Sequence, residues 1–291
     1  MKNHGILTIV FLLFFAPLLI AQNETLMVRY LPPEEDIGWN SQYYSKLLEL
    51  ALDKTIDTHG PYELVPGDIA MNQRDALKAM MQGKGVDVVF TMTDKTRERV
   101  LLPVRVPLVK GLIGARLVMI NKEDDRLFRG VANVEDLKEY SFGQGYDWPD
   151  TEILKYNDLK VNTAQEYPAL FTMLDNGVID GFPRAVFEIW DEILEHRDQE
   201  FAVVDGFYIY YPSAMYFFVK KDMRGAELQK RLYTGLMEAI EDGSFDKLFN
   251  AQMGEHLKRA KLNERTAIIL QNPLLSDDTP LENEALWYLK N

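Results

Sequence analysis

Two short segments of this 291-residue chain place arginine directly after an apolar run that is expected to form a buried strand. In the first segment, residues 86–90 lead into a polar stretch that contains Arg97 and Arg99. In the second, residues 178–182 lead into Arg184. A guanidinium group carries five N–H donors in a planar fork, which suits a carboxylate or a phosphate group. The two segments together predict a site that grips a small anion from two sides.

Hydroxyl and aromatic side chains lie near the same predicted strand ends. Threonine hydroxyls can hydrogen-bond a ligand, and aromatic rings can contact its body. The full set of predicted ligand-binding residues is Arg97, Arg184, Tyr30, Trp39, Thr91, Thr93, Tyr146 and Phe182. Two alternatives stay open: the aromatic residues belong to the hydrophobic core, and Arg184 pairs with Glu188 four residues further along instead of facing a ligand.

The elements that must position these residues alternate between apolar strands and amphipathic helices. Residues 26–31, 62–65 and 86–90 read as strands, and the segments 41–52 and 74–82 between them have apolar residues at helical spacing. Short connections between strand and helix are typical of a parallel sheet that is covered by helices on both faces. Such sheets bind ligands at the carboxyl ends of their strands.

A second strand–helix alternation follows, and the chain then returns through another apolar segment. The sequence therefore predicts an α/β protein with two lobes, each built on a mainly parallel sheet flanked by helices. Lobe 1 is expected to comprise residues 26–110 plus 213–255, and lobe 2 residues 111–212. The chain would cross between the lobes twice, near residues 109–114 and 206–213. Residues 256–291 form an extension whose apolar content predicts that it packs on lobe 1.

Composition excludes several classes of function. Lys and Arg number 32 and Asp and Glu 45, so the chain carries a formal charge of −13 and is a poor partner for nucleic acid. It has no cysteine, which excludes thiolate metal sites and cysteine nucleophiles. Its four histidines form no HExxH motif or other helical metal pair. The Gly143-Gln144-Gly145 segment lacks the third glycine of a dinucleotide loop, because Trp148 holds that position. We expect no metal and no cofactor.

The first 21 residues resemble a secretory signal peptide. Lys2 precedes an almost purely apolar run over residues 6–20, which is shorter than a membrane-spanning helix, and Ala21 is a small residue suited to cleavage before Gln22. The alternative is an uncleaved N-terminal anchor. An exported, acidic, cysteine-free chain is typical of the bacterial periplasm.

The order and spacing of the segments from about residue 26 to 250 resemble the type II periplasmic binding proteins, specifically the family 3 solute-binding proteins. This group includes the binding components of polar amino acid ABC transporters. The segments that carry the resemblance are 75–90, 93–97, 101–108, 117–120, 134–137, 143–145, 215–222 and 228–245. The resemblance implies a monomeric, two-lobed protein that closes like a hinge on a small molecule, with an ABC permease or a membrane sensor as its partner.

Two positions depart from what the resemblance implies. Amino-acid binders of this family use a first-lobe arginine to bind the ligand carboxylate, for which Arg97 is the best match and Arg99 the alternative. They also use an aspartate after a second-lobe strand to bind the ligand ammonium, and that position holds Ala185. Either the ligand lacks a standard α-amino group or another acid supplies the contact. The ligand is therefore expected to be small, anionic and carboxylate-bearing.

The resemblance leaves other functions open. The chain could be a ligand-sensing module for a membrane receptor, or a periplasmic dehydratase-like enzyme on the same fold. The sequence shows no histidine suited to proton transfer between the lobes, so we predict a binding protein and not an enzyme.

The signal-peptide interpretation makes a direct prediction. N-terminal sequencing of the protein from a periplasmic extract should begin near Gln22. Recovery of the intact chain, starting at Met1, from the membrane fraction would show that the segment is an anchor.

Overall fold

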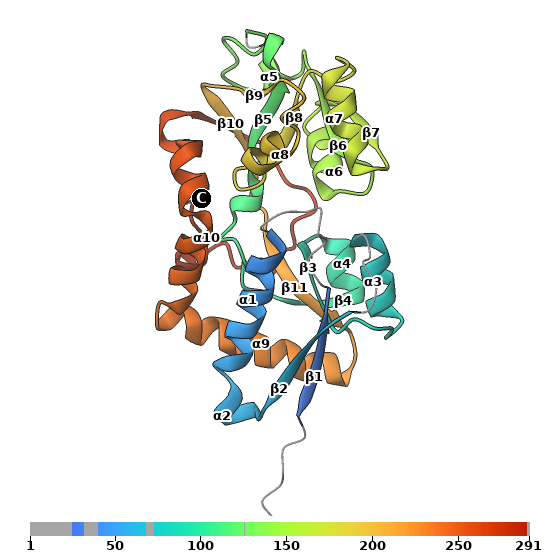
Figure 1. Ribbon diagram of the computed structural model, residues 1–291, viewed down its shortest axis with the longest axis vertical. Coiled ribbons are helices and arrows are strands. Elements are labelled where there is room, and N and C mark those ends of the chain that lie inside the picture. Colours follow the sequence, from blue (N-terminus) through green and yellow to red (C-terminus); the bar gives the residue numbers. More distant parts are fainter. Residues whose placement is uncertain (1–24, 32–39, 68–72, 125, 290–291) are drawn as a thin grey trace, which may run out of the picture.

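The protein is described by a computed structural model that covers residues 25–31, 40–67, 73–124 and 126–289. Two groups of strands, each flanked by helices, form two lobes that lie one above the other in Figure 1. The predicted two-lobed α/β architecture is confirmed. Among the helices in these ranges, none is long and apolar enough to cross a membrane.

The lower lobe, lobe 1, is built on one five-stranded sheet in the order β2-β1-β3-β11-β4. Its first three strands run parallel, whereas β11 runs antiparallel to both of its neighbours. Helices α1 and α9 lie against each other, with α1 to the left of the sheet and α9 lower in Figure 1, and α3 and α4 lie to the right of the sheet. The strands are β1 (Leu26–Tyr30), β2 (Tyr62–Pro66), β3 (Val88–Met92), β4 (Leu101–Val104) and β11 (Met215–Lys220); the helices are α1 (Asn40–Asp53), α2 (Ile56–His59), α3 (Gln73–Met81), α4 (Lys95–Val100) and α9 (Met223–Glu241).

The upper lobe, lobe 2, differs from the prediction in strand direction. Its main sheet has the order β12-β10-β5-β8, with β9 also paired to β5. Strand β5 runs antiparallel to β8, β9 and β10, so this sheet is not mainly parallel. The chain enters the lobe through β5, after the first crossing, and leaves it through β10, at the second crossing. Because these two strands are neighbours in the sheet, they run in opposite directions. The strands are β5 (Ala115–Asn121), β8 (Phe182–Ala185), β9 (Phe201–Val203), β10 (Phe207–Tyr210) and β12 (Thr266–Ile269).

A second, two-stranded parallel sheet completes lobe 2 together with four helices. Its strands are β6 (Ser141–Gly145) and β7 (Lys160–Ala164), and the helices are α5 (Val134–Leu137), α6 (Pro149–Tyr156), α7 (Tyr167–Asp175) and α8 (Ile189–Glu195).

The strand predicted at residues 178–182 is displaced along the chain. The Asp180 carboxylate accepts hydrogen bonds from the backbone and the hydroxyl of Ser141 at 2.6 and 2.7 Å, which holds residues 178–180 as a bend beside β6. Strand β8 therefore begins at Phe182. Arg184 lies within this buried strand, and not in a loop after it.

The C-terminal extension does not pack on lobe 1 alone. Helix α10 (Ser244–Ala260) begins against lobe 1 and stands along one side of both lobes in Figure 1. The next strand, β12, pairs in parallel with β10 of lobe 2. Only the residues after β12 return to lobe 1. The predicted location is wrong for residues 266–269, because the apolar segment at Ile268 finds its partner strand in the other lobe.

Helix α1 is held in place by a close approach to α9. A Cβ atom added at Gly235 of α9 would lie 1.8 Å from the backbone oxygen of Ala51 in α1. Since real Cβ contacts of this kind do not occur, a larger residue would force the two helices apart.

We predict that Gly235→Ala lowers the free energy of unfolding by about 1–3 kcal/mol or more, because it overpacks this contact. The matched control is Gly254→Ala in α10, where a Cβ would meet no atom within 4 Å. Alanine there should raise stability by about 0.5–1 kcal/mol, since glycine is unfavourable inside a helix. Urea unfolding of both variants measures the difference, and equal effects would contradict the close packing.

Candidate functional site

Charged residues of the two lobes face each other where the lobes meet. At one edge, Arg74 of α3 binds Asp147 of lobe 2, with the Nη2–Oδ2 distance 2.9 Å, and its guanidinium lies 5.7 Å from the Tyr146 ring. Further in, the carboxylates of Asp147 and Asp150 of lobe 2 raise the pKa of Arg97 of lobe 1 through their charges. The lobes are therefore closed on one another in this structure.

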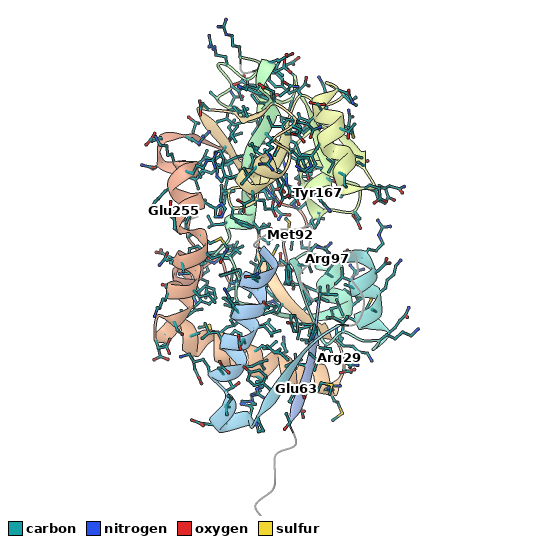
Figure 2. The ribbon with its side chains drawn as sticks, in the orientation of Figure 1. Arg29, Glu63, Met92, Arg97, Tyr167 and Glu255 are labelled. Carbon is teal, nitrogen blue, oxygen red and sulfur yellow. The ribbon has the colours of Figure 1, made fainter. Side chains whose placement is uncertain are left out.

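We call the surface formed by Arg97 of lobe 1 and by Arg116, Asp150 and Glu188 of lobe 2 the interlobe site. Figure 2 places Arg97 at the edge of lobe 1 that faces lobe 2. The arginine lies in α4, whose first turn is capped by the Asp94 carboxylate at the Arg97 backbone N–H, 2.8 Å away. The short helix thus begins just after β3 ends. This is the carboxyl end of a parallel strand, where open α/β sheets bind their ligands.

The Arg97 guanidinium is half-buried and held by lobe 1 itself. Its Nη1 donates to the Thr91 hydroxyl at 3.1 Å and to the Met92 carbonyl at 2.5 Å, and its Nε lies 3.1 Å from Asp94 Oδ2. Burial lowers the pKa of Arg97, while the carboxylates of Asp94, Asp147 and Asp150 oppose that shift. Arg99, the alternative, is exposed. The geometry thus selects Arg97 over Arg99 as the arginine between the lobes.

Arg116 forms the centre of the lobe 2 side. It is the second residue of β5 and is almost fully buried, with its Nη2 2.5 Å from Asp150 Oδ1 and its Nη1 3.3 Å from Glu188 Oε2. Its Nε donates to the Tyr211 hydroxyl at 2.9 Å, and that hydroxyl in turn donates to Asp150. Burial alone would lower the pKa of Arg116, but Asp150, Tyr211 and Glu188 raise it. The Arg116 guanidinium therefore stays protonated, and its charge is balanced by the carboxylates of Asp150 and Glu188.

Arg184 belongs to the same buried network. Its guanidinium contacts Glu192 through two nitrogens, with Nε–O distances of 2.9 and 2.8 Å and an Nη2–O distance of 2.5 Å, and it lies 3.1 Å from Glu188. The Trp148 and Phe182 rings stand 4.9 and 5.0 Å from it. The alternative considered from the sequence, pairing with Glu188, is what the structure shows. The charge of Arg184 is already matched inside lobe 2, so this residue is not expected to bind an anionic ligand.

The lobe 2 network carries one excess negative charge. Asp150, Glu188 and Glu192 are three carboxylates around the two guanidinium groups of Arg116 and Arg184. Glu188 also accepts a hydrogen bond from the Ala185 backbone N–H at 3.0 Å. The Glu188 carboxylate therefore lies beside Ala185, the position at which the family resemblance implied an aspartate.

Aromatic residues of lobe 1 lie next to these charges. Tyr44 of α1 stacks on Phe90 with ring centroids 4.0 Å apart, and both line a small cavity together with Tyr30. Among the residues that the structure describes, no group hydrogen-bonds the buried Tyr44 hydroxyl. Burial raises the pKa of Tyr44 well above its usual value, and the nearby Glu188 carboxylate adds to the shift. The hydroxyl thus stays protonated and can hydrogen-bond a solute.

The remaining predicted site residues lie in different environments. Thr93 is buried and its hydroxyl donates to Glu98 Oε1 at 2.6 Å. Phe182 is fully buried, stacked on Trp148 and edge-on to Phe171, so it belongs to the core. Tyr146 is 59% exposed beside Arg74. Trp39 lies outside the described residues.

Sequence reasoning missed Arg116 and Tyr211 of the network and Tyr44 of lobe 1, and it considered Glu188 only as a partner of Arg184. The available signal was Arg116, a charged residue that directly precedes a run of apolar residues in a predicted buried strand. An arginine at such a position requires buried partners. Neither spacing nor motif could identify those partners, because they come from separate parts of the fold.

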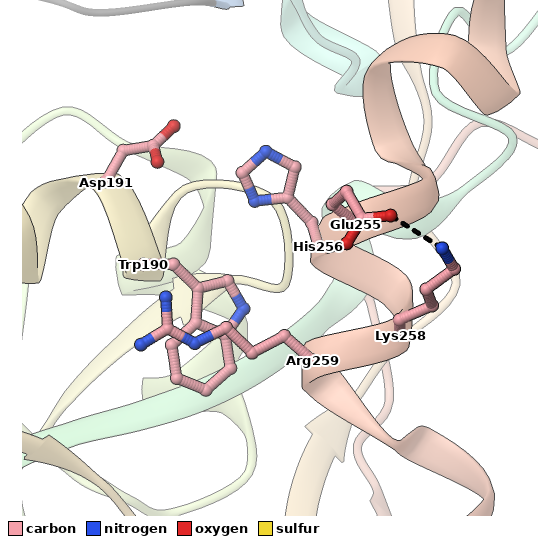
Figure 3. A pocket seen from close by; sticks show the side chains of 6 residues that line it. All are labelled: Trp190, Asp191, Glu255, His256, Lys258 and Arg259. Carbon is pink, nitrogen blue, oxygen red and sulfur yellow. Dashed lines mark hydrogen bonds and ion pairs between the residues drawn. The ribbon is translucent and has the colours of Figure 1, made fainter.

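A larger cavity, of about 580 Å³, lies between α8 and α10. Figure 3 shows the Arg259 side chain lying over the Trp190 ring, 4.2 Å from its centroid, and Lys258 paired with Glu255. Burial lowers the pKa of His256, which Asp191 opposes. Because its charges are balanced and several already pair, this cavity is a weaker candidate for a solute site than the interlobe site.

In the part of the chain that the structure describes, no three His, Cys, Asp or Glu side chains are grouped so that they could hold a metal ion.

The buried network makes a prediction about stability. Glu192→Ala would leave Arg184 and the Tyr167 hydroxyl, which donates to Glu192 at 2.7 Å, without their main partner. We expect the free energy of unfolding to fall by about 3–5 kcal/mol. The control is Glu200→Ala, which removes an exposed pair with Lys122 and should cost less than about 1 kcal/mol. Similar values for both variants in urea unfolding would contradict a buried network.

Comparison with known proteins adds to this geometry. No protein-family model and no curated protein matches the sequence. Solved structures do match. An ancestral arginine-binding protein bound to arginine superimposes with a TM-score of 0.57 at 18% identity, covering 80% of this chain and 100% of that one. A Salmonella typhimurium periplasmic binding protein with high arginine specificity gives 0.55 at 14% identity, covering 78% and 98%. A Silicibacter pomeroyi periplasmic binding protein of the His/Glu/Gln/Arg/opine family, in complex with lysine, gives 0.56 at 12% identity, covering 79% and 98%.

Structural similarity at this low sequence identity establishes the fold alone. The match covers almost the whole length of each similar structure, while about a fifth of the present chain lies outside it. The resemblance noted in the sequence is thereby confirmed at the level of structure: the chain has the two-lobed fold of the substrate-binding proteins of amino acid ABC transporters.

Proposed function

We propose that the protein is an exported solute-binding protein that captures a small amino-acid-like molecule at the interlobe site. The observation that carries the proposal is the arrangement of opposite charges on opposite lobes. Arg97 stands on lobe 1, and a network with excess negative charge that includes Asp150 and Glu188 stands on lobe 2. A solute with a carboxylate and an ammonium group would satisfy both sides as the lobes close.

This proposal refines the ligand expected from the sequence. A purely anionic solute would meet the excess carboxylate of lobe 2 and be repelled. A carboxylate-bearing solute that also carries a cationic group would place its carboxylate at Arg97 and its ammonium near Glu188. Of the two explanations left open for Ala185, the second is therefore preferred: another acid supplies the ammonium contact. The similar structures bound to arginine and lysine agree with this class of solute.

The protonated Tyr44 hydroxyl is a further candidate contact. It is buried, and the carboxylate of Glu188, on the other lobe, is close enough to affect its pKa. An ammonium group bound by Glu188 could also donate a hydrogen bond to the Tyr44 hydroxyl oxygen.

The signal-peptide-like N-terminus and the fold together support a periplasmic protein that delivers its solute to an ABC permease. The same capture step would serve a membrane receptor that senses the solute, so the binding chemistry is common to both. The proposal assigns binding to the interlobe site and no catalytic step.

We predict that Arg97→Ala weakens solute binding by roughly 10- to 150-fold, since a hydrogen bond to a charged group contributes about 1.5–3 kcal/mol. Calorimetric titration of the parent protein with the individual L-amino acids, beginning with arginine, lysine and glutamine, first identifies a solute. Arg99→Ala, at the exposed arginine two residues away, is the matched control and should bind as the parent does. Loss of affinity in Arg99→Ala but not in Arg97→Ala would overturn the assignment.

The charge of Glu188 makes a separate prediction. Glu188→Gln keeps the shape of the side chain but removes its negative charge, so it should weaken binding of a zwitterionic or cationic solute and not of a dicarboxylate. Circular dichroism verifies that the variant is folded. Unchanged affinity for the zwitterion, or tighter binding of a dicarboxylate by the parent protein, would contradict the proposed orientation.

A further inference from the structure

We propose that the C-terminal segment, residues 262–289, is a clamp that joins the two lobes and limits how far they open. The two crossings predicted from the sequence near residues 109–114 and 206–213 are not the only connections. The segment runs from lobe 2 back to lobe 1 and contacts both crossings on the way. The clamp limits the motion of the lobes whether or not a solute binds. Only its consequence for the exchange of solute rests on the proposed function.

The first half of the segment follows the second crossing. Residues 266–269 pair in parallel with β10, the strand that leads into this crossing. The Leu270 N–H then donates to the Tyr210 carbonyl at 2.7 Å, and the Asn272 side chain donates to the Pro212 carbonyl at 2.9 Å. Asn157 at the end of α6 exchanges two hydrogen bonds with Gln271, at 2.8 and 3.0 Å. The segment is therefore bound to lobe 2 and to the crossing itself.

The next residues bind lobe 1 at the helix that carries Arg97. The Leu274 carbonyl accepts a hydrogen bond from the Lys95 N–H at 2.9 Å, at the first residue of α4. The Pro273 carbonyl accepts another from Lys95 Nζ at 3.3 Å. Further along, Asp278 lies 3.0 Å from Arg105 Nη2. Within a few residues the chain thus passes from α6 of lobe 2 to α4 of lobe 1.

The end of the segment packs on the first crossing. The buried Trp287 ring lies so close to Gly111 that a Cβ atom there would be 2.4 Å from it. The Tyr288 N–H donates to the Lys110 carbonyl at 2.8 Å. Lys110 and Gly111 both have positive φ angles, of 49° and 76°. The backbone of this crossing therefore has an uncommon conformation that the Trp287 ring covers.

These contacts restrict a hinge motion in a specific way. A hinge absorbs lobe rotation through changes of φ and ψ in a few residues. Here, rotation at Lys110 and Gly111 would displace the Trp287 ring, and rotation near Pro212 would strain the bonds of residues 270–274 that reach both lobes. Helix α10 already carries the chain from lobe 1 to β12 of lobe 2, so residues 270–274 are a further connection. Because this connection must lengthen or detach before the lobes separate, the closed arrangement is favoured even without a solute.

The absence of cysteine from the chain makes a direct test possible. Gln82→Cys and Gln165→Cys place one unique thiol on an exposed position of each lobe, and spin labels on them report the interlobe distance by pulsed electron–electron double resonance. The full-length, solute-free protein should give one dominant distance, with any longer-distance population below about a tenth. Trp287→Ala or Asn272→Ala in the same background should raise the longer-distance population at least about fivefold.

The control variant is Ile269→Ala, which shortens a side chain of the same segment that is 56% exposed and leaves the backbone pairing of β12 intact. It should leave the distance distribution unchanged. Circular dichroism verifies folding, and Trp287→Phe replaces Trp287→Ala if the latter does not fold. The proposal is overturned if folded Trp287 and Asn272 variants keep the parent distribution, or if Ile269→Ala shifts it equally. Because no solute is used, this outcome is independent of whether the interlobe site binds amino acids.

Discussion

A single buried cation, Arg116, determines how the side of lobe 2 that faces lobe 1 is built. It lies at the start of β5, where the chain has just entered the lobe, and it is almost fully buried. A buried charge is tolerated only when it is paired and hydrogen-bonded. Its three partners, Asp150, Glu188 and Tyr211, come from α6, from the loop before α8 and from the second crossing. Matching one guanidinium thus ties the helices of lobe 2 to the hinge.

The same network connects structure to the proposed binding. Arg184 shares Glu188 with Arg116 and is otherwise satisfied by Glu192, which leaves the network with one carboxylate in excess. Lobe 1 presents Arg97, held by Asp94 and Thr91, to this negative surface. Closing the lobes without a solute leaves the Tyr44 hydroxyl without a hydrogen-bond partner among the described residues. A zwitterionic solute would bind both charged surfaces and could satisfy that hydroxyl.

The parts of this arrangement that depend on local sequence could be predicted. The apolar runs around Val88 and Phe217 form the expected strands, and Arg97 follows the first of them on a short helix capped by Asp94. The direction of β5 could not be predicted from its own residues, because it is set by where the chain enters and leaves the lobe. The strand expected before Arg184 begins later, since a side-chain contact between Asp180 and Ser141 holds a bend there.

The partners of the buried charged residues could not be predicted from the sequence either. Glu188 lies three residues after the position where an acid was expected, and only the bend of the chain between β8 and α8 brings its carboxylate back to Ala185. The apolar residues around Ile268 correctly indicated burial, but their partner strand, β10, lies in the lobe opposite to the one expected. Such pairings depend on the three-dimensional course of the chain and leave no periodic signal.

Native mass spectrometry of the purified full-length protein tests the central claim most directly, because it detects any co-purified solute by its mass, whatever its chemical identity. The account predicts one bound molecule with the mass of a small amino-acid-like compound, released by acid, present in Arg99→Ala and lost in Arg97→Ala. A bound molecule that persists in both Arg97→Ala and Glu188→Gln would contradict binding between the two lobes.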